Sequence, residues 1–147
     1  MFSPHLIARG RGNIITVTSG IAFLPFPLMP TYAATEAEVR ADTESLRAQL
    51  AGTGSDVTEL IPPAVARSGQ QQVDAAALPL DVFLDEVIDL LTVSQTADEI
   101  PVKGVLQHRW AERDGTYAEL VERRSQSLKI LPGPRQKYLL SPGRTCP

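Results

Sequence analysis

The sequence predicts an α/β fold: a partial doubly wound sheet of two or three parallel strands with helices on its faces. Three segments carry this prediction, residues 13–18, 31–50 and 56–61. The first and third are short runs rich in β-branched residues, whereas apolar residues in the middle segment recur at helical spacing. A strand, a helix and a second strand in this order form one βαβ unit, whose strands pair in parallel.

The first predicted strand, residues 13–18, reads Asn-Ile-Ile-Thr-Val-Thr and is bounded by glycines. A continuous apolar run of this length is typical of a buried strand in a parallel sheet. Residues 20–30 follow as a loop interrupted by prolines. The loop should therefore connect the strand to the next helix without regular structure of its own.

The helix predicted over residues 31–50 ends before Gly52 and Gly54, which stop helices. Its expected apolar positions are Tyr32, Ala33, Ala37, Val39, Leu46 and Leu50. The second strand, residues 56–61, alternates in polarity and ends at a pair of prolines.

The rest of the chain divides into a polar loop, two helices and a tail. Residues 67–77 are polar and predict a mobile loop. An apolar stripe at helical spacing then predicts a helix whose stripe is either core or interface: Leu80, Phe83, Leu84, Val87, Ile88 and Leu91.

Residues 100–102 predict a short edge strand, because Pro101 cannot donate a ladder hydrogen bond. Residues 116–128 predict a modest helix. The tail over residues 131–147 holds four prolines and two glycines, so we expect disorder there and a folded domain over residues 1–130.

Composition excludes several classes of function. A net charge of −3 leaves no excess of positive charge for binding nucleic acid. The sequence also has no run of eighteen apolar residues, which a membrane-spanning helix would need. Cys146 is the single cysteine, so one chain can form neither a disulfide nor a thiolate metal site. His5 and His108 have no partner at metal or triad spacing and are interpreted as surface residues. No signal peptide is evident, so we expect a cytoplasmic protein with no metal.

The motifs resemble one enzyme family. The chain reads GNIITVTSG, then PTYAATEAEVRADTESLRAQL, then VTELIPPAV, with Tyr32 thirteen residues after Ser19. This order of strand, serine, tyrosine helix and proline turn resembles the second half of a short-chain dehydrogenase/reductase. Within that family it is most similar to the branch named after DltE, whose members carry a PLDEF helix like the PLDVF at residues 79–83.

The resemblance implies an NAD- or NADP-dependent oxidoreductase that moves hydride between nicotinamide and a carbonyl or alcohol. Ser19 would polarise the carbonyl oxygen, and Tyr32 would transfer the proton and contact the cofactor. The turn after the second strand would meet the nicotinamide through Pro62, Pro63, Ala64 and Val65. Two nearby aromatics and a methionine would line a substrate pocket or form exposed apolar surface: Phe23, Phe26 and Met29.

Two departures from the family pattern matter. The family's glycine-rich turn, which binds the cofactor pyrophosphate, has no counterpart in these residues, so residues 1–130 are expected to be a truncated domain. Glu36 also stands where the family has a lysine that lowers the tyrosine pKa. The Glu36 carboxylate, one helical turn from Tyr32, carries the charge opposite to that of the lysine, so it should raise the tyrosine pKa. Arg40, one turn further along the helix, is the remaining candidate for supplying a positive charge to Tyr32.

Three functional hypotheses follow from these departures. In the first, the chain is an inactive homologue. In the second, it completes its site with a partner that supplies the dinucleotide-binding half. In the third, it is an interaction protein that pairs through its tyrosine-bearing helix or an exposed sheet edge, with a homo-oligomer as one outcome.

Overall fold

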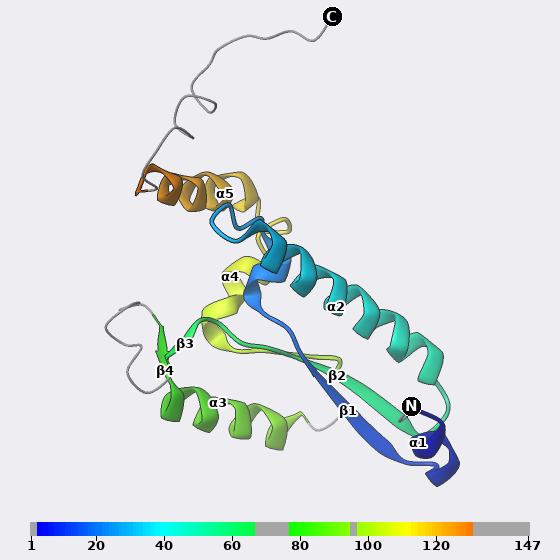
Figure 1. The fold of residues 1–147 in the computed structure, drawn as a ribbon. Helices are drawn as coiled ribbons and strands as arrows, with labels where there is room; N and C mark the ends of the chain where they lie inside the picture. The colour runs from blue at the N-terminus through cyan, green and yellow to red at the C-terminus, as the bar shows by residue number, and fades with distance from the viewer. Residues whose placement is uncertain (1–2, 67–76, 95–96, 131–147) are drawn as a thin grey trace, which may run out of the picture.

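Three parallel strands form the centre of the computed structural model, which describes residues 3–66, 77–94 and 97–130 (Figure 1). They are β1 (Gly12–Val17), β2 (Ser55–Ile61) and β5 (Glu99–Pro101), in the order β1-β2-β5. Helix α2 (Pro30–Leu50) lies on one side of the sheet and α3 (Leu80–Val93) on the other. The predicted fold class, a partial doubly wound parallel sheet, is confirmed.

The predicted βαβ unit is present nearly residue for residue. Strand β1 pairs in parallel with β2, in a register that sets Ile14 opposite Val57 and Val17 opposite Leu60. Strand β5 pairs with β2 along the other edge and ends at Pro101, whose missing N–H suits a strand end.

Several short elements were not predicted. They are α1 (Ser3–Arg9), α4 (Leu106–Arg109), the two-residue strands β3 (Val65–Ala66) and β4 (Leu78–Pro79), and the 3-10 helices η1 (Gly20–Phe23), η2 (Lys103–Val105) and η3 (Gln126–Ile130). Helix α5 (Tyr117–Ser125) is shorter than predicted, because the chain tightens into η3 after it. The predicted tail, residues 131–147, and all but the last residue of the predicted mobile loop lie outside the described residues.

The inner face of α2 is polar over its middle turns, which corrects much of the apolar face expected from its sequence, whereas Leu50 at the helix end is buried as expected. Val39 is 40% exposed, whereas Thr43 is fully buried and bonds the Thr16 hydroxyl of β1 at 2.9 Å. Arg47 donates to the Val57 carbonyl oxygen of β2 at 2.9 Å. Helix α2 is therefore held to the sheet largely by hydrogen bonds and charge rather than by an apolar stripe.

One buried carboxylate joins these elements. Glu59 of β2 is fully buried, accepts the Thr18 hydroxyl at 2.7 Å and pairs with Arg40 of α2 at 2.6 Å. Arg40 also pairs with Glu99 of β5 at 3.0 Å, and Glu99 in turn receives two hydrogen bonds from Arg109 of α4. The network thus connects β2, β5 and the residue that follows β1 with α2 and α4.

A cluster of buried apolar residues lies beyond the sheet. Leu24, Ala111 and Leu120 are buried together, with Tyr117 and Val121 packed against them. Figure 1 shows α5 beside the start of α2. This cluster therefore brings the end of the described chain close to the predicted site.

Only part of the apolar stripe of α3 is core, and much of it is exposed. Val87 is buried, but Leu80, Leu84 and Ile88 are 46–60% exposed. The prediction that the first strand is buried is wrong: β1 is an outer strand of the sheet, and its Ile15 and Val17 are 46% and 59% exposed. The interface interpretation of the stripe stays a prediction. None of the described helices is long and apolar enough to cross a membrane.

We predict that Arg40→Met destabilises the fold by about 3–5 kcal/mol, because it leaves the Glu59 carboxylate buried without its counter-charge. Adding Glu59→Gln should recover part of that loss by removing the buried charge. Urea unfolding followed by circular dichroism measures both. As a control, Arg123→Met removes an exposed pair with Glu119 and should change stability by less than about 1 kcal/mol. Equal effects of Arg40→Met and Arg123→Met would contradict the role given to the buried pair.

Candidate functional site

Ser19 lies at the carboxyl end of β1, where the chain turns into η1. Its side-chain oxygen accepts a hydrogen bond from Ile21 N at 3.4 Å and so caps this short helix. The next residue, Gly20, donates its N–H to the Pro62 carbonyl oxygen at 3.1 Å. A Cβ on Gly20 would meet Val105 at 3.0 Å and His108 at 3.3 Å, so glycine allows α4 to approach the serine closely. Ser19 is therefore held in place by the backbone contacts of the residues that follow it.

Tyr32 lies in the first turn of α2, which begins with Pro30 at its first helical position. The phenol is 46% exposed, and Glu36 follows it one turn later on the same face. The pKa of Tyr32 is raised, first by partial burial and then by its side-chain interaction with the Glu36 carboxylate and that group's negative charge. The Ser19 hydroxyl acts in the opposite direction and lowers this pKa.

The predicted site residues meet at one cavity of about 450 Å³. Its lining includes Ser19, Tyr32, Pro63, Ala64 and Val65. Pro62 does not line the cavity. Its carbonyl oxygen accepts a hydrogen bond from the N–H of Gly20, which is a lining residue. The remaining lining residues are Gly20, Ile21, Phe26, Met29, His108 and Arg124. The structure thus brings together the serine, the tyrosine and the proline turn, while their chemical roles stay predictions.

Arg40 does not supply a positive charge to Tyr32. Its guanidinium pairs with Glu44 at 2.7 Å as well as with Glu59 and Glu99. It also lies over the Phe23 ring, 4.6 Å from its centroid. The cation is therefore surrounded by three carboxylates, and the one charged group beside the phenol in the helix is Glu36.

Two residues of the cavity were missed by the sequence analysis. His108 was interpreted as a surface residue, and this is wrong, since it is half-buried in the cavity with its Nε2 3.3 Å from an Arg124 nitrogen. Burial, and then the charge of Arg124, lower the His108 pKa to about 4, so the imidazole is neutral at pH 7. Neither residue has a partner nearby in sequence, so no local motif could have indicated them.

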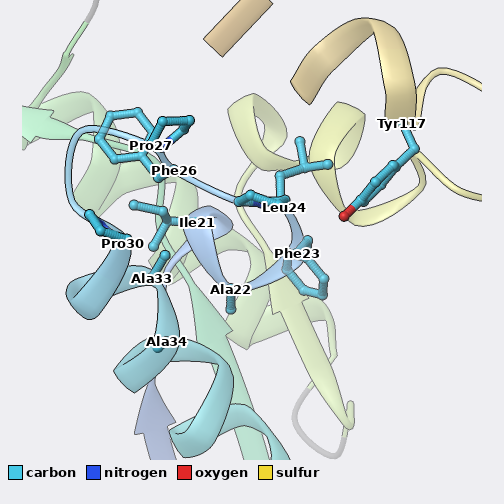
Figure 2. A pocket seen from close by; sticks show the side chains of 11 residues that line it. Ile21, Ala22, Phe23, Leu24, Phe26, Pro27, Pro30, Ala33, Ala34 and Tyr117 are labelled. Atoms are coloured by element: carbon cyan, nitrogen blue, oxygen red, sulfur yellow. The ribbon is translucent and has the colours of Figure 1, made fainter. Parts of the chain in front are cut away.

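A second cavity, of about 360 Å³, lies between the loop after η1, the first turns of α2 and Tyr117 of α5 (Figure 2). Its side-chain lining is almost wholly apolar, and it includes Phe23 and Phe26. Of the three residues expected near a substrate, Phe26 and Met29 line the serine cavity, whereas Phe23 lines only the second one. Because the second cavity contains neither Ser19 nor Tyr32, the serine cavity is the candidate site.

Curated relatives match parts of the chain. It is 42% identical over 65 residues to the uncharacterized oxidoreductase DltE of Bacillus subtilis, covering 44% of this chain and 26% of that protein. Over 149 residues it is 28% identical to the NADPH-dependent 1-acyldihydroxyacetone phosphate reductase of Schizosaccharomyces pombe, covering 95% of this chain and 49% of that protein. The chain thus spans between about a quarter and a half of these relatives.

Solved structures agree with this relationship. A short chain dehydrogenase from Burkholderia cenocepacia, in complex with NADP, has a TM-score of 0.65 and 26% identity, covering 82% of this chain and 51% of that one. A short-chain dehydrogenase from Streptomyces avermitilis has a TM-score of 0.63 at 19% identity, over 88% and 56% of the two chains, and shows the shared fold. The family model for short chain dehydrogenase matches residues 1–77. The chain belongs to the short-chain dehydrogenase family.

Proposed function

We propose that this chain contributes the carbonyl-binding part of an NAD(P)-dependent oxidoreductase site, and that Glu36 keeps this site from transferring hydride efficiently near neutral pH. The observation that carries the proposal is the meeting of Ser19 and Tyr32 at one cavity, with Glu36 one turn from the phenol. The hydroxyl pair supports binding of a carbonyl or alcohol. The carboxylate argues against rapid proton transfer.

The charge of Glu36 matters because the Tyr32 phenol must be ionised at one stage of the reaction. When a carbonyl is reduced, its oxygen gains negative charge and must receive a proton from Tyr32, which leaves a phenolate. Alcohol oxidation needs the phenolate at the start, as the base. A neighbouring cation would stabilise this anion in both directions, whereas the Glu36 carboxylate repels it. Ser19 orients the carbonyl oxygen in either case.

NAD or NADP is the cofactor that the family relationship supports, and the Burkholderia cenocepacia neighbour was solved with NADP. The described residues fit one end of such a cofactor. Pro63, Ala64 and Val65 border the cavity beside Tyr32, where they would contact the nicotinamide. Glu36 can accept hydrogen bonds from ribose hydroxyls but cannot supply positive charge. No glycine-rich turn for the pyrophosphate occurs within the described ranges. When bound, the cofactor would supply the hydride.

A second function, pairing with another chain, is favoured by β1. This strand is at the end of the strand order, and its Ile15 and Val17 side chains are exposed beside it. An apolar strand with a free edge pairs readily with another strand. A partner carrying the dinucleotide-binding half, or a second copy of this chain, would cover that edge. In the first case it would also complete the cofactor site.

We predict that Glu36→Lys raises the carbonyl reductase activity about tenfold or more when the dinucleotide-binding half of a relative such as DltE is fused before Met1. The fusion supplies the pyrophosphate turn, and each 1.36 kcal/mol of transition-state stabilisation is worth tenfold in rate. NADPH oxidation with a simple aryl ketone measures the activity. Glu36→Gln, which removes the negative charge without adding a cation, should fall between the two.

Tyr32→Phe should abolish the gain in the Glu36→Lys fusion, because it removes the proton donor. A fusion that retains Glu36 and is already as active as the Glu36→Lys variant would refute the proposal.

We also predict that the chain has a mass in light scattering above its monomer mass of 15.9 kDa, and that Val17→Lys lowers it. The lysine places a charge on the exposed face of β1. Val39→Lys, on the exposed face of α2, is the control for pairing through the tyrosine-bearing helix. A monomeric chain, or an oligomer that dissociates only with Val39→Lys, would contradict pairing through β1.

A further inference from the structure

Arg124 reaches the serine cavity from α5 and is held in a fixed position. One of its terminal nitrogens donates to the Leu24 carbonyl oxygen at 3.2 Å, and the other lies 3.3 Å from His108 Nε2. The guanidinium carbon is 5.5 Å from the centroid of the Phe26 ring. An arginine always donates, so the neutral imidazole of His108 must accept at Nε2 and carry its own proton on Nδ1. These contacts aim a rigid cation at the cavity.

The positive charge of Arg124 is not compensated within the described ranges. Five other arginines there pair with carboxylates, namely Arg40, Arg47, Arg109, Arg113 and Arg123, but no such ion pair is formed by Arg124. Its side chain is half-buried, so the charge is partly removed from water, and this burial lowers its pKa. A desolvated cation without a counter-ion is costly unless an anion joins it.

The guanidinium also has hydrogen-bonding capacity to spare. It carries five N–H donors, and contacts to Leu24 and His108 occupy two of them. Arg124 is the one charged side chain among the residues that line the cavity, because His108 is neutral at pH 7. The cavity therefore combines a cation, the hydroxyls of Ser19 and Tyr32, and apolar surface from Ile21, Phe26 and Met29.

We propose that this cavity binds carbonyl compounds that carry an acidic group, with the acidic group held by Arg124. This inference rests on the proposed function only in placing the carbonyl oxygen between Ser19 and Tyr32. Arginine suits the task because its planar fork matches a carboxylate. A cavity of about 450 Å³ is large enough for such a compound together with an apolar substituent.

The test compares how tightly the unaltered chain binds an acid and the uncharged methyl ester of that acid. Binding of 4-phenyl-2-oxobutanoate and of its methyl ester is measured by titration calorimetry at pH 7. The two share the ketone and the phenyl group and differ in charge. We expect the acid to bind about tenfold or more tightly than the ester. Equal affinities would overturn the inference, and so would equally tight binding of inorganic phosphate, which has no carbonyl.

Variants locate the acidic group. Arg124→Gln should remove the preference for the acid, and Arg124→Lys should retain part of it. Arg123→Gln is the matched control, since this neighbouring arginine is exposed and pairs with Glu119, and it should leave the preference unchanged. An Arg124→Gln chain that still prefers the acid would refute the assignment. If that variant fails to fold, the comparison of acid and ester on the unaltered chain still tests whether the cavity prefers an acidic ligand.

A nuclear magnetic resonance titration of His108 gives a second readout on the unaltered chain, which has only two histidines. A carboxylate beside Arg124 cancels the charge that helps to depress the His108 pKa, so the acid should raise that pKa from about 4 relative to the ester. The 2-oxo acid remains ionised through this range. An unchanged His108 pKa would count against the inference.

Failure of the proposed function would give a different pattern of binding results from failure of the anion site. Ser19→Ala and Tyr32→Phe should weaken both the acid and the ester if the carbonyl lies between these hydroxyls. If neither variant weakens binding while Arg124→Gln abolishes the preference for the acid, the anion site stands and the carbonyl placement is wrong.

Discussion

The ion pair between Arg40 and Glu59 fixes the positions on which the site depends. Glu59 is fully buried in the central strand, and its second contact is the Thr18 hydroxyl, immediately before Ser19. Arg40 lies two turns after Tyr32 on α2. One buried contact therefore sets the distance between the strand end that carries the serine and the helix that carries the tyrosine. The same network reaches α4, which brings His108 to the cavity.

This arrangement also sets the electrostatics of the site. Because Arg40 is surrounded by Glu44, Glu59 and Glu99, its charge is used to hold α2 on the sheet. The phenol of Tyr32 is left with Glu36 as its charged neighbour in the helix, and the cation of the cavity is Arg124. In the family pattern a lysine beside the tyrosine favours its ionised form. In this chain the charged side chain that lines the cavity is Arg124 of α5, outside the helix that carries the tyrosine.

The sequence predicted the parts of this structure that depend on local spacing. The βαβ unit follows from residue periodicity, and serine and tyrosine meet because a parallel strand end and the start of the next helix share one edge of a sheet. The polar inner face of α2 could not be predicted, since its partners Thr16, Glu59 and Glu99 come from three different strand segments. Arg124 was missed for the same reason: it bonds Leu24, one hundred residues away in the chain.

We expect partial burial, together with the Glu36 carboxylate, to raise the pKa of Tyr32 and so to keep the phenol protonated near neutral pH. A carbon-13 titration of tyrosine ring carbons tests it most directly, because the chain has only three tyrosines and Tyr32→Phe identifies the signal. We expect a Tyr32 pKa above the ordinary value of 10.0, and a lower Tyr32 pKa in Glu36→Gln while circular dichroism shows the fold intact. A Tyr32 pKa below that ordinary value, unchanged by Glu36→Gln, would contradict it.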